Sequence, residues 1–129
     1  MNELNNLVTA VGNYNSIPTS LTSNTSVVNM IEGLTITKTA DKINWADGEL
    51  TYTIVIDNKT NQTYENPTIT DIIDTSLVEF INDSVTIDGV KATSSQYNYN
   101  TETHTLTISP DSIIPSSSST LTFQVTKKI

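Results

Sequence analysis

Cysteine, arginine and long apolar runs are all missing from this 129-residue chain. Without cysteine the chain has no disulfide, no thiolate nucleophile and no thiolate ligand for zinc. Without arginine, and with 6 basic residues against 14 acidic ones, the net charge is −8. Such a surface repels phosphates, so we expect neither nucleic acid nor anionic membranes as partners. No segment approaches the roughly 20 apolar residues of a spanning helix, so no membrane insertion is expected.

Signals for export, catalysis and metal binding are equally sparse. The opening residues, MNELNN, have neither the basic nor the apolar segment of a signal peptide, so no signal peptide is evident. The single histidine, His104, falls in a predicted strand without a nucleophile elbow nearby, and we expect no enzyme active site. Acidic residues gather near Asp47 and Asp88 without EF-hand spacing, so no metal or other cofactor is expected.

Short alternating segments separated by turn signals fill the chain from Gly33 to Ile129. The turn signals include Asp47-Gly48 and Asp88-Gly89, whose residues tolerate positive φ. This spacing is typical of an all-β, antiparallel sandwich or barrel. The predicted strands are 34–40, 49–58, 68–73, 78–82, 84–87, 90–93, 96–100, 103–109 and 119–127.

Residues 1–32 have a different pattern and are predicted to form an N-terminal arm. Apolar residues from Leu4 to Val11 have helical spacing, and a polar Ser/Thr/Asn tract follows. Such a segment buries little surface by itself, so we expect it to dock, either back on its own sandwich or on a neighbouring subunit. The candidate anchors are Leu21, Val27, Val28, Met30 and Ile31.

Three polar residues fall on the apolar faces of predicted strands. Alternate side chains of a strand share a face, which places Lys38, Asn58 and Asp71 among aliphatic neighbours. A desolvated lysine beside an amide and an acid can form an isopeptide bond, with loss of ammonia from Asn58 or of water from Asp71. The alternative is structural: Lys38 extends to solvent, Asn58 opens a turn, and Asp71 binds backbone N–H groups.

The same residues carry a family resemblance. The runs LTITKTAD (34–41), GELTYTIVIDN (48–58), PTITDIID (67–74) and VEFINDSVTIDG (78–89) resemble the DUF11 repeat family. The resemblance covers residues 33–129 and implies an immunoglobulin-like β-sandwich with an N-terminal extension, used in microbial surface proteins and spore appendages. Lys38, Asn58 and Asp71 fall on recurrent positions of that family. The chain departs from it at Asp74-Thr-Ser, where the family has a proline-containing turn, and in having a single copy.

Together these features favour a structural subunit over an enzyme. An arm that enters the sandwich of the next copy makes a head-to-tail contact that does not close, and the result is a filament. We therefore expect a homopolymer on an extracellular or spore surface. The alternative function is an adhesion or carbohydrate-binding module with contacts around Trp45 and Tyr64.

Overall fold

The computed structural model describes residues 2–128 of the chain. It divides into two compact units at the boundary between Glu32 and Gly33. Every regular element among the described residues is a β-strand, so the fold is all-β. The described part of the chain contains no helix with the length and apolar character needed to cross a bilayer.

The first unit, the arm, is a two-stranded antiparallel ribbon. Its strands are β1 (Asn2–Asn6), β2 (Thr9–Tyr14), β3 (Ile17–Thr22) and β4 (Ser26–Met30). The chain runs out through β1 and β2 and returns through β3 and β4, with β1 paired to β4 and β2 paired to β3. The helix suggested by the apolar spacing from Leu4 to Val11 is therefore wrong, because these residues lie on an extended ribbon.

Two local features shape the ribbon. Asn15 and Ser16 both have positive φ, at 51° and 65°, and form the two-residue turn that joins Tyr14 to Ile17. Positive φ at both central residues gives the type of hairpin turn whose twist matches the flanking strands. The second feature lies between β1 and β2. Asn6 pairs with Ser26, and the Ser23 N–H donates to the Val8 carbonyl. Leu7, the one residue between Asn6 and Val8, therefore lies opposite the two residues between Ser23 and Ser26. This two-against-one arrangement is a β-bulge.

The second unit, residues 33–129, contains the remaining strands. They are β5 (Leu34–Ala40), β6 (Glu49–Asn58), β7 (Ile69–Ile72), β8 (Val78–Phe80), β9 (Thr86–Ile87), β10 (Val90–Lys91), β11 (Tyr97–Asn100), β12 (Thr105–Ile108) and β13 (Ser117–Lys127). The turns predicted at Asp47-Gly48 and Asp88-Gly89 agree with the structure, in which Gly48, Asp88 and Gly89 adopt positive φ.

These strands form two antiparallel sheets. A 6-stranded sheet has the order β10-β9-β13-β6-β5, with β8 also paired to β13. A 3-stranded sheet has the order β11-β12-β7. The long β6–β13 ladder runs from the pair Asn58 and Ser117 to the pair Glu49 and Thr126 and forms the centre of the larger sheet.

The core lies between the two sheets, as a sandwich requires. Leu106 and Ile108 of β12 are fully buried, and so are Leu121, Phe123 and Val125 of β13. The core residues lie between Leu50 and Val125, all within this second unit. The sandwich therefore has the packing it needs to fold without the arm.

One strand departs from the expected burial. Leu34, Ile36, Lys38 and Ala40 of β5 share a face, and their partners on β6 include the buried Ile54 and Ile56. That shared face therefore points inward. Ile36 is nevertheless 60% exposed, because β5 is the edge strand and the smaller sheet does not extend over it. The inward face of β5 is thus left partly uncovered.

Candidate functional site

Each half of the arm, β1–β4 and β2–β3, gathers apolar side chains on one side. In an antiparallel ribbon, directly paired residues point to the same side. The pairs Leu4 with Val28, Ala10 with Leu21, and Tyr14 with Ile17 therefore each place two apolar side chains together. Such pairs place Leu4 and Val28, with Met30, on one side of the β1–β4 half and Ala10, Tyr14, Ile17 and Leu21 on one side of the β2–β3 half; the latter set is called the apolar face of the ribbon.

These large side chains are not covered by other residues of the arm. Leu21 is 66% exposed, and Leu4, Tyr14, Ile17, Val28 and Met30 are exposed as well. An open hollow near the turn is lined by Ala10, Val11, Gly12, Asn13, Tyr14, Thr19 and Leu21. Exposed apolar surface of this extent is typical of an interaction site.

The predicted anchors all lie on the arm, but they do not share one face. Leu21 belongs to β3, Val27, Val28 and Met30 to β4, and Ile31 follows β4; all five are exposed. Val27 pairs with Asn5 and so points away from Val28 and Leu4. Leu4, Tyr14 and Ile17 were missed as candidates, because only the strand register shows that they join the anchors.

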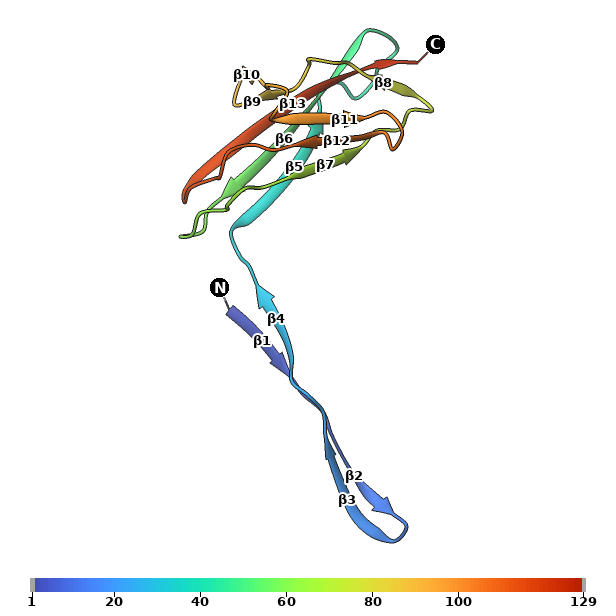
Figure 1. Cartoon of the computed structure of the whole chain (residues 1–129), viewed down its shortest axis with the longest axis vertical. Coiled ribbons are helices and arrows are strands. Elements are labelled where there is room, and N and C mark those ends of the chain that lie inside the picture. The colour runs from blue at the N-terminus through green and yellow to red at the C-terminus, as the bar shows by residue number, and fades with distance from the viewer. Residues whose placement is uncertain (1, 129) are drawn as a thin grey trace. The chain divides into compact units, whose positions relative to one another are not determined.

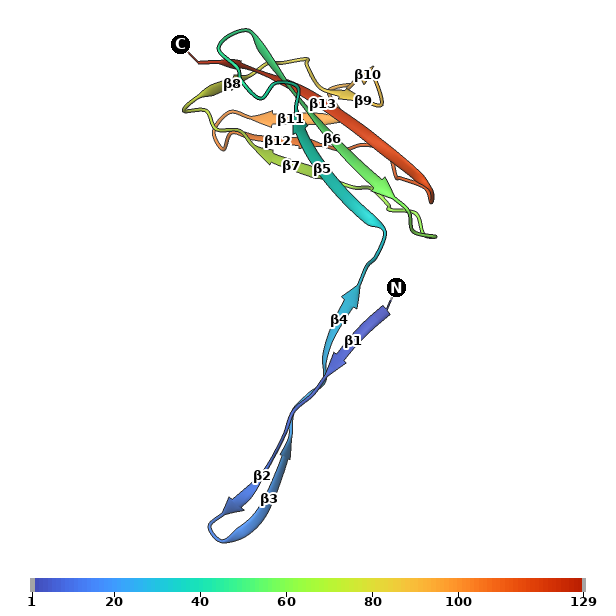
Figure 2. The same ribbon diagram turned by 180° about the vertical axis from the view of Figure 1, so that it is seen from behind.

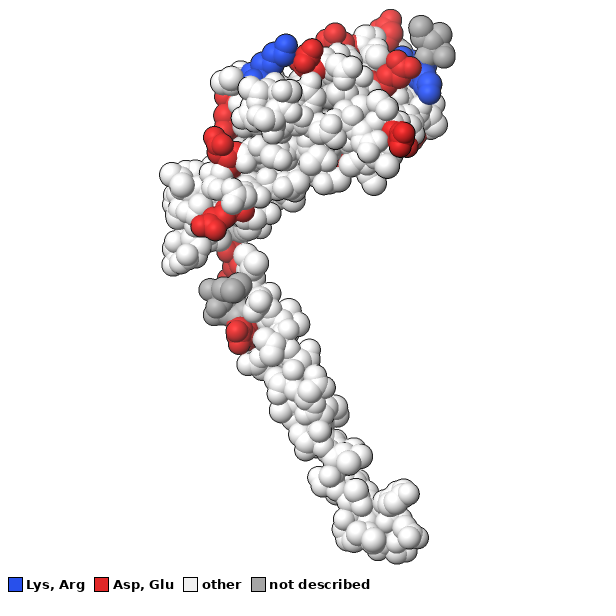
Figure 3. Space-filling view, viewed as in Figure 1, with Lys and Arg blue, Asp and Glu red and all other residues white. Residues whose placement is uncertain are grey.

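Charge is absent from the same segment. No residue from Leu4 through Ile31 is acidic or basic, and every lysine belongs to the sandwich. The surface of this segment is uncoloured in the charge view (Figure 3). The segment from Leu4 to Ile31 is therefore a mixed apolar and polar surface that neither attracts nor repels a charged partner strongly.

On the sandwich, the structure brings together two of the three predicted crosslinking residues. Lys38 Nζ on β5 lies 2.7 Å from Asp71 Oδ2 on β7, and the two side chains are 43% and 13% exposed. The same Nζ lies 4.5 Å from the centre of the Tyr52 ring and 5.7 Å from that of Phe123. Aromatic faces attract a cation, so both the carboxylate and the rings stabilise the charged lysine. The contact is an ion pair that joins the edge strands of the two sheets.

Asn58, the third candidate, has other partners. Its side chain is fully buried, and its Nδ2 donates to the carbonyls of Gln62 and Ile113, both at 2.8 Å. Its Oδ1 accepts from the backbone N–H and the hydroxyl of Thr60. Asn58 of β6 pairs with Leu34 of β5. Lys38 of β5 pairs instead with Ile54, which lies four positions before Asn58 on β6. The structure therefore does not bring Asn58 to Lys38.

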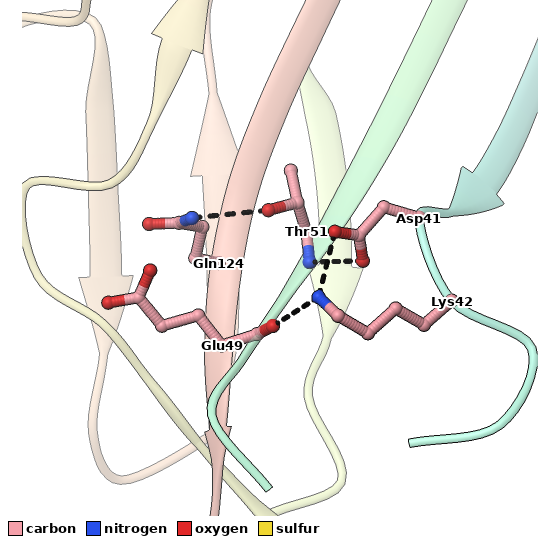
Figure 4. Close-up of polar contacts among 5 residues, drawn as sticks. All are labelled: Asp41, Lys42, Glu49, Thr51 and Gln124. Carbon is pink, nitrogen blue, oxygen red and sulfur yellow. Dashed lines mark hydrogen bonds and ion pairs between the residues drawn. The ribbon is translucent and has the colours of Figure 1, made fainter.

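The loop between β5 and β6 is held by a separate polar network (Figure 4). Asp41 Oδ1 accepts from the Thr51 N–H at 3.0 Å, and Asp41 Oδ2 lies 3.0 Å from Lys42 Nζ. Lys42 Nζ also donates to the Glu49 carbonyl at 2.8 Å. The bond from the Thr51 N–H, followed by that from Lys42, lowers the pKa of Asp41 below its ordinary value of 3.8. These bonds anchor the loop to the start of β6.

The other residues considered for binding or chemistry lie apart from one another. Trp45 packs against the sandwich core, and the backbone of Tyr64 forms an isolated antiparallel β-bridge with Ile113. His104 lies in the turn before β12 with a φ of 56°, so its placement within a strand was wrong. Among residues 2–128, no group of three or more metal-ligating side chains comes together.

Comparison with known proteins returns no match for this chain among protein-family models, curated proteins or solved structures.

Proposed function

We propose that this protein is a structural, self-assembling subunit of a filament, in which the arm of one copy docks on the sandwich of the next. The sandwich supplies a rigid body and the arm supplies the connection. The observation that carries the proposal is the arm itself: a two-stranded ribbon without charged residues from Leu4 to Ile31 and with exposed apolar side chains.

The low stability expected of an isolated two-stranded ribbon supports the need for a partner. A lone two-stranded hairpin is marginally stable in water, and further strands or a packed face are needed to stabilise it. Among the described residues, each strand of the arm pairs with one other strand of the arm, and the sandwich core consists of residues of the second unit. Covering Leu21, Tyr14 and Ile17 contributes about 25 cal/mol for each Å² of apolar surface removed from water. Docking on another copy provides that cover.

The resemblance to DUF11 repeats supports the setting. Modules of that family build microbial surface proteins and spore appendages, so we place the filament on an extracellular or spore surface, with an immunoglobulin-like strand arrangement in the sandwich.

Removal of the arm tests this function. The full chain and a chain of residues 33–129 are compared by light scattering and electron microscopy across a range of protein concentrations. We expect the full chain to form filaments and the truncated chain to be a folded monomer, because its core is complete. Filaments of the same form from the truncated chain would remove the arm from the mechanism, and a full chain that stays monomeric throughout would reject self-assembly.

A further inference from the structure

We propose that the arm docks in a slot formed by the open edge of β7 and the uncovered inward face of β5, and that the occupant is the β2 edge of a second copy's ribbon. This inference rests on the proposed self-assembly and specifies its contact surfaces. In the assembly, the ribbon extends the 3-stranded sheet from β11-β12-β7 to β2 and β3 of the neighbouring copy.

The open edge of β7 has identifiable backbone groups. The Ile73 N–H donates to the His104 carbonyl at 2.9 Å, in the same register as the β7–β12 ladder. Backbone groups alternate in direction along an antiparallel strand, so Asp71 and Ile69 also face β12. The N–H and C=O groups of Thr70 and Ile72 therefore point away from β12, to the side on which β7 pairs with no strand among residues 2–128. A docked strand would bond to these groups.

The floor of the slot is β5. The Lys38–Asp71 ion pair shows that β5 and β7 lie on the same side of the sandwich, and both views agree (Figure 1, Figure 2). A strand added beside β7 would continue the smaller sheet over the inward face of β5. It would cover Ile36, which faces inward with no strand over it. The slot thus offers backbone pairing from one sheet and an apolar contact from the other.

One edge of the ribbon suits this slot better than the other. The Ser23 N–H donates to the Val8 carbonyl, so by alternation Ala10, Gly12 and Tyr14 of β2 bond inward to β3. Thr9, Val11 and Asn13 therefore point their backbone groups outward. On β3 the corresponding outward position opposite Asn13 is Pro18, which has no N–H to donate. Proline blunts a strand edge, so β2 is the edge available for pairing.

Charge compatibility supports a copy of this chain as the occupant. The sandwich is acidic overall and would repel an acidic partner at long range, yet in the slot the charges of Lys38 and Asp71 compensate each other. An uncharged apolar strand therefore fits the slot without an unpaired charge. The ribbon from Leu4 to Ile31 is such a segment, and its apolar face would turn toward Ile36.

Two proline substitutions in the full chain test both edges. Thr70→Pro removes an outward N–H from β7, and Val11→Pro removes one from β2; neither N–H takes part in a ladder of the monomer. Thr70→Ala and Val11→Ala are the matched controls, since they change the side chain and keep the N–H. We expect both alanine variants to assemble like the wild type and both proline variants to be monomers by light scattering, with unchanged circular dichroism.

Mixing the proline variants completes the test. Thr70→Pro keeps an intact donor edge and Val11→Pro keeps an intact slot, so their equimolar mixture should give a 1:1 dimer that grows no further. Assembly of Thr70→Pro at the wild-type mass would overturn the slot while leaving self-assembly intact. A mixture that stays monomeric would overturn pairing between copies and indicate docking within one chain. A wild type that never assembles would reject the proposed function itself.

Discussion

Lys38 Nζ lies 2.7 Å from Asp71 Oδ2, and this ion pair joins the edge strand of the larger sheet to the edge strand of the smaller one. The carboxylate is the more buried partner, at 13% exposed against 43% for the lysine. Loss of the ion pair therefore affects the two side chains differently. A lysine freed from its partner can turn to solvent, whereas the carboxylate of Asp71 remains largely enclosed.

A double-mutant cycle measures this dependence. We expect Lys38→Met to lower the free energy of unfolding more than Asp71→Asn does, because it leaves a largely buried carboxylate without its cation. The coupling between the two sites should be about 1 kcal/mol and should fall as salt is added. Urea unfolding of the two single variants and the double variant gives these values. The exposed pair of Lys59 and Asp57, at 3.6 Å, is the matched control and should show weaker coupling.

Intact mass under denaturing conditions tests whether Lys38 and Asp71 are joined covalently. We expect the unmodified mass, because the lysine is partly exposed and lies against its partner as a charged ion pair. Loss of one water from the wild type, but not from Lys38→Ala, would instead establish an isopeptide bond to Asp71. Loss of ammonia would point to Asn58 and would contradict the hydrogen bonds that hold its amide elsewhere.

Asn58 should be a major stabilising residue of the sandwich. Its amide donates to two carbonyls from different loops, Gln62 and Ile113, and is fully buried. Asn58→Asp preserves the shape but directs a carboxylate at both carbonyls, so we expect a loss of at least about 3 kcal/mol in the free energy of unfolding. Asn98→Ala, on the exposed side of β11, is the control and should change stability by less than about 0.5 kcal/mol. An Asn58→Asp variant as stable as the wild type would contradict this role.

The strands of the sandwich were predictable because their alternation is strong. The bounds of β5 and β6 agree with those predicted, and the faces of β6 and β7 are those expected from parity. Parity, however, assigns a face without saying what covers it. The exposure of Ile36 depends on how far the smaller sheet extends, and the partners of Asn58 depend on where two distant loops meet. Neither is encoded in the pattern of one strand.

The arm was the least predictable part, for local reasons. Leu4, Leu7, Val8 and Val11 match a helical period by chance, and the bulge opposite Leu7 interrupts the strand pairing. The turn at Asn15 and Ser16 lacks the glycine that usually marks a two-residue hairpin. A search for paired apolar residues around that turn, such as Tyr14 with Ile17, would have found the ribbon.

The loop network of Asp41 gives a prediction for acid stability. Because the pKa of Asp41 is lowered in the folded state, the unfolded state binds more protons as the pH falls. The stabilisation is therefore fully present above the ordinary value of 3.8 and is lost as the pH falls through the lower, folded-state pKa. Asp41→Asn still accepts the Thr51 N–H but loses the charge that pairs with Lys42.

We therefore expect the wild type to be more stable than Asp41→Asn near neutral pH and the difference to shrink below pH 3.8. Urea midpoints measured across this range provide the comparison. The pKa of Asp74 is lowered too, by hydrogen bonds from the hydroxyl and N–H of Ser76. Asp74→Asn should therefore also change how stability falls with pH in this acidic range. Because Ser76 is only two residues away, this turn persists more readily in the unfolded chain, and its effect should be the smaller of the two. A difference between wild type and Asp41→Asn that grows as the pH falls would contradict the sign of this linkage.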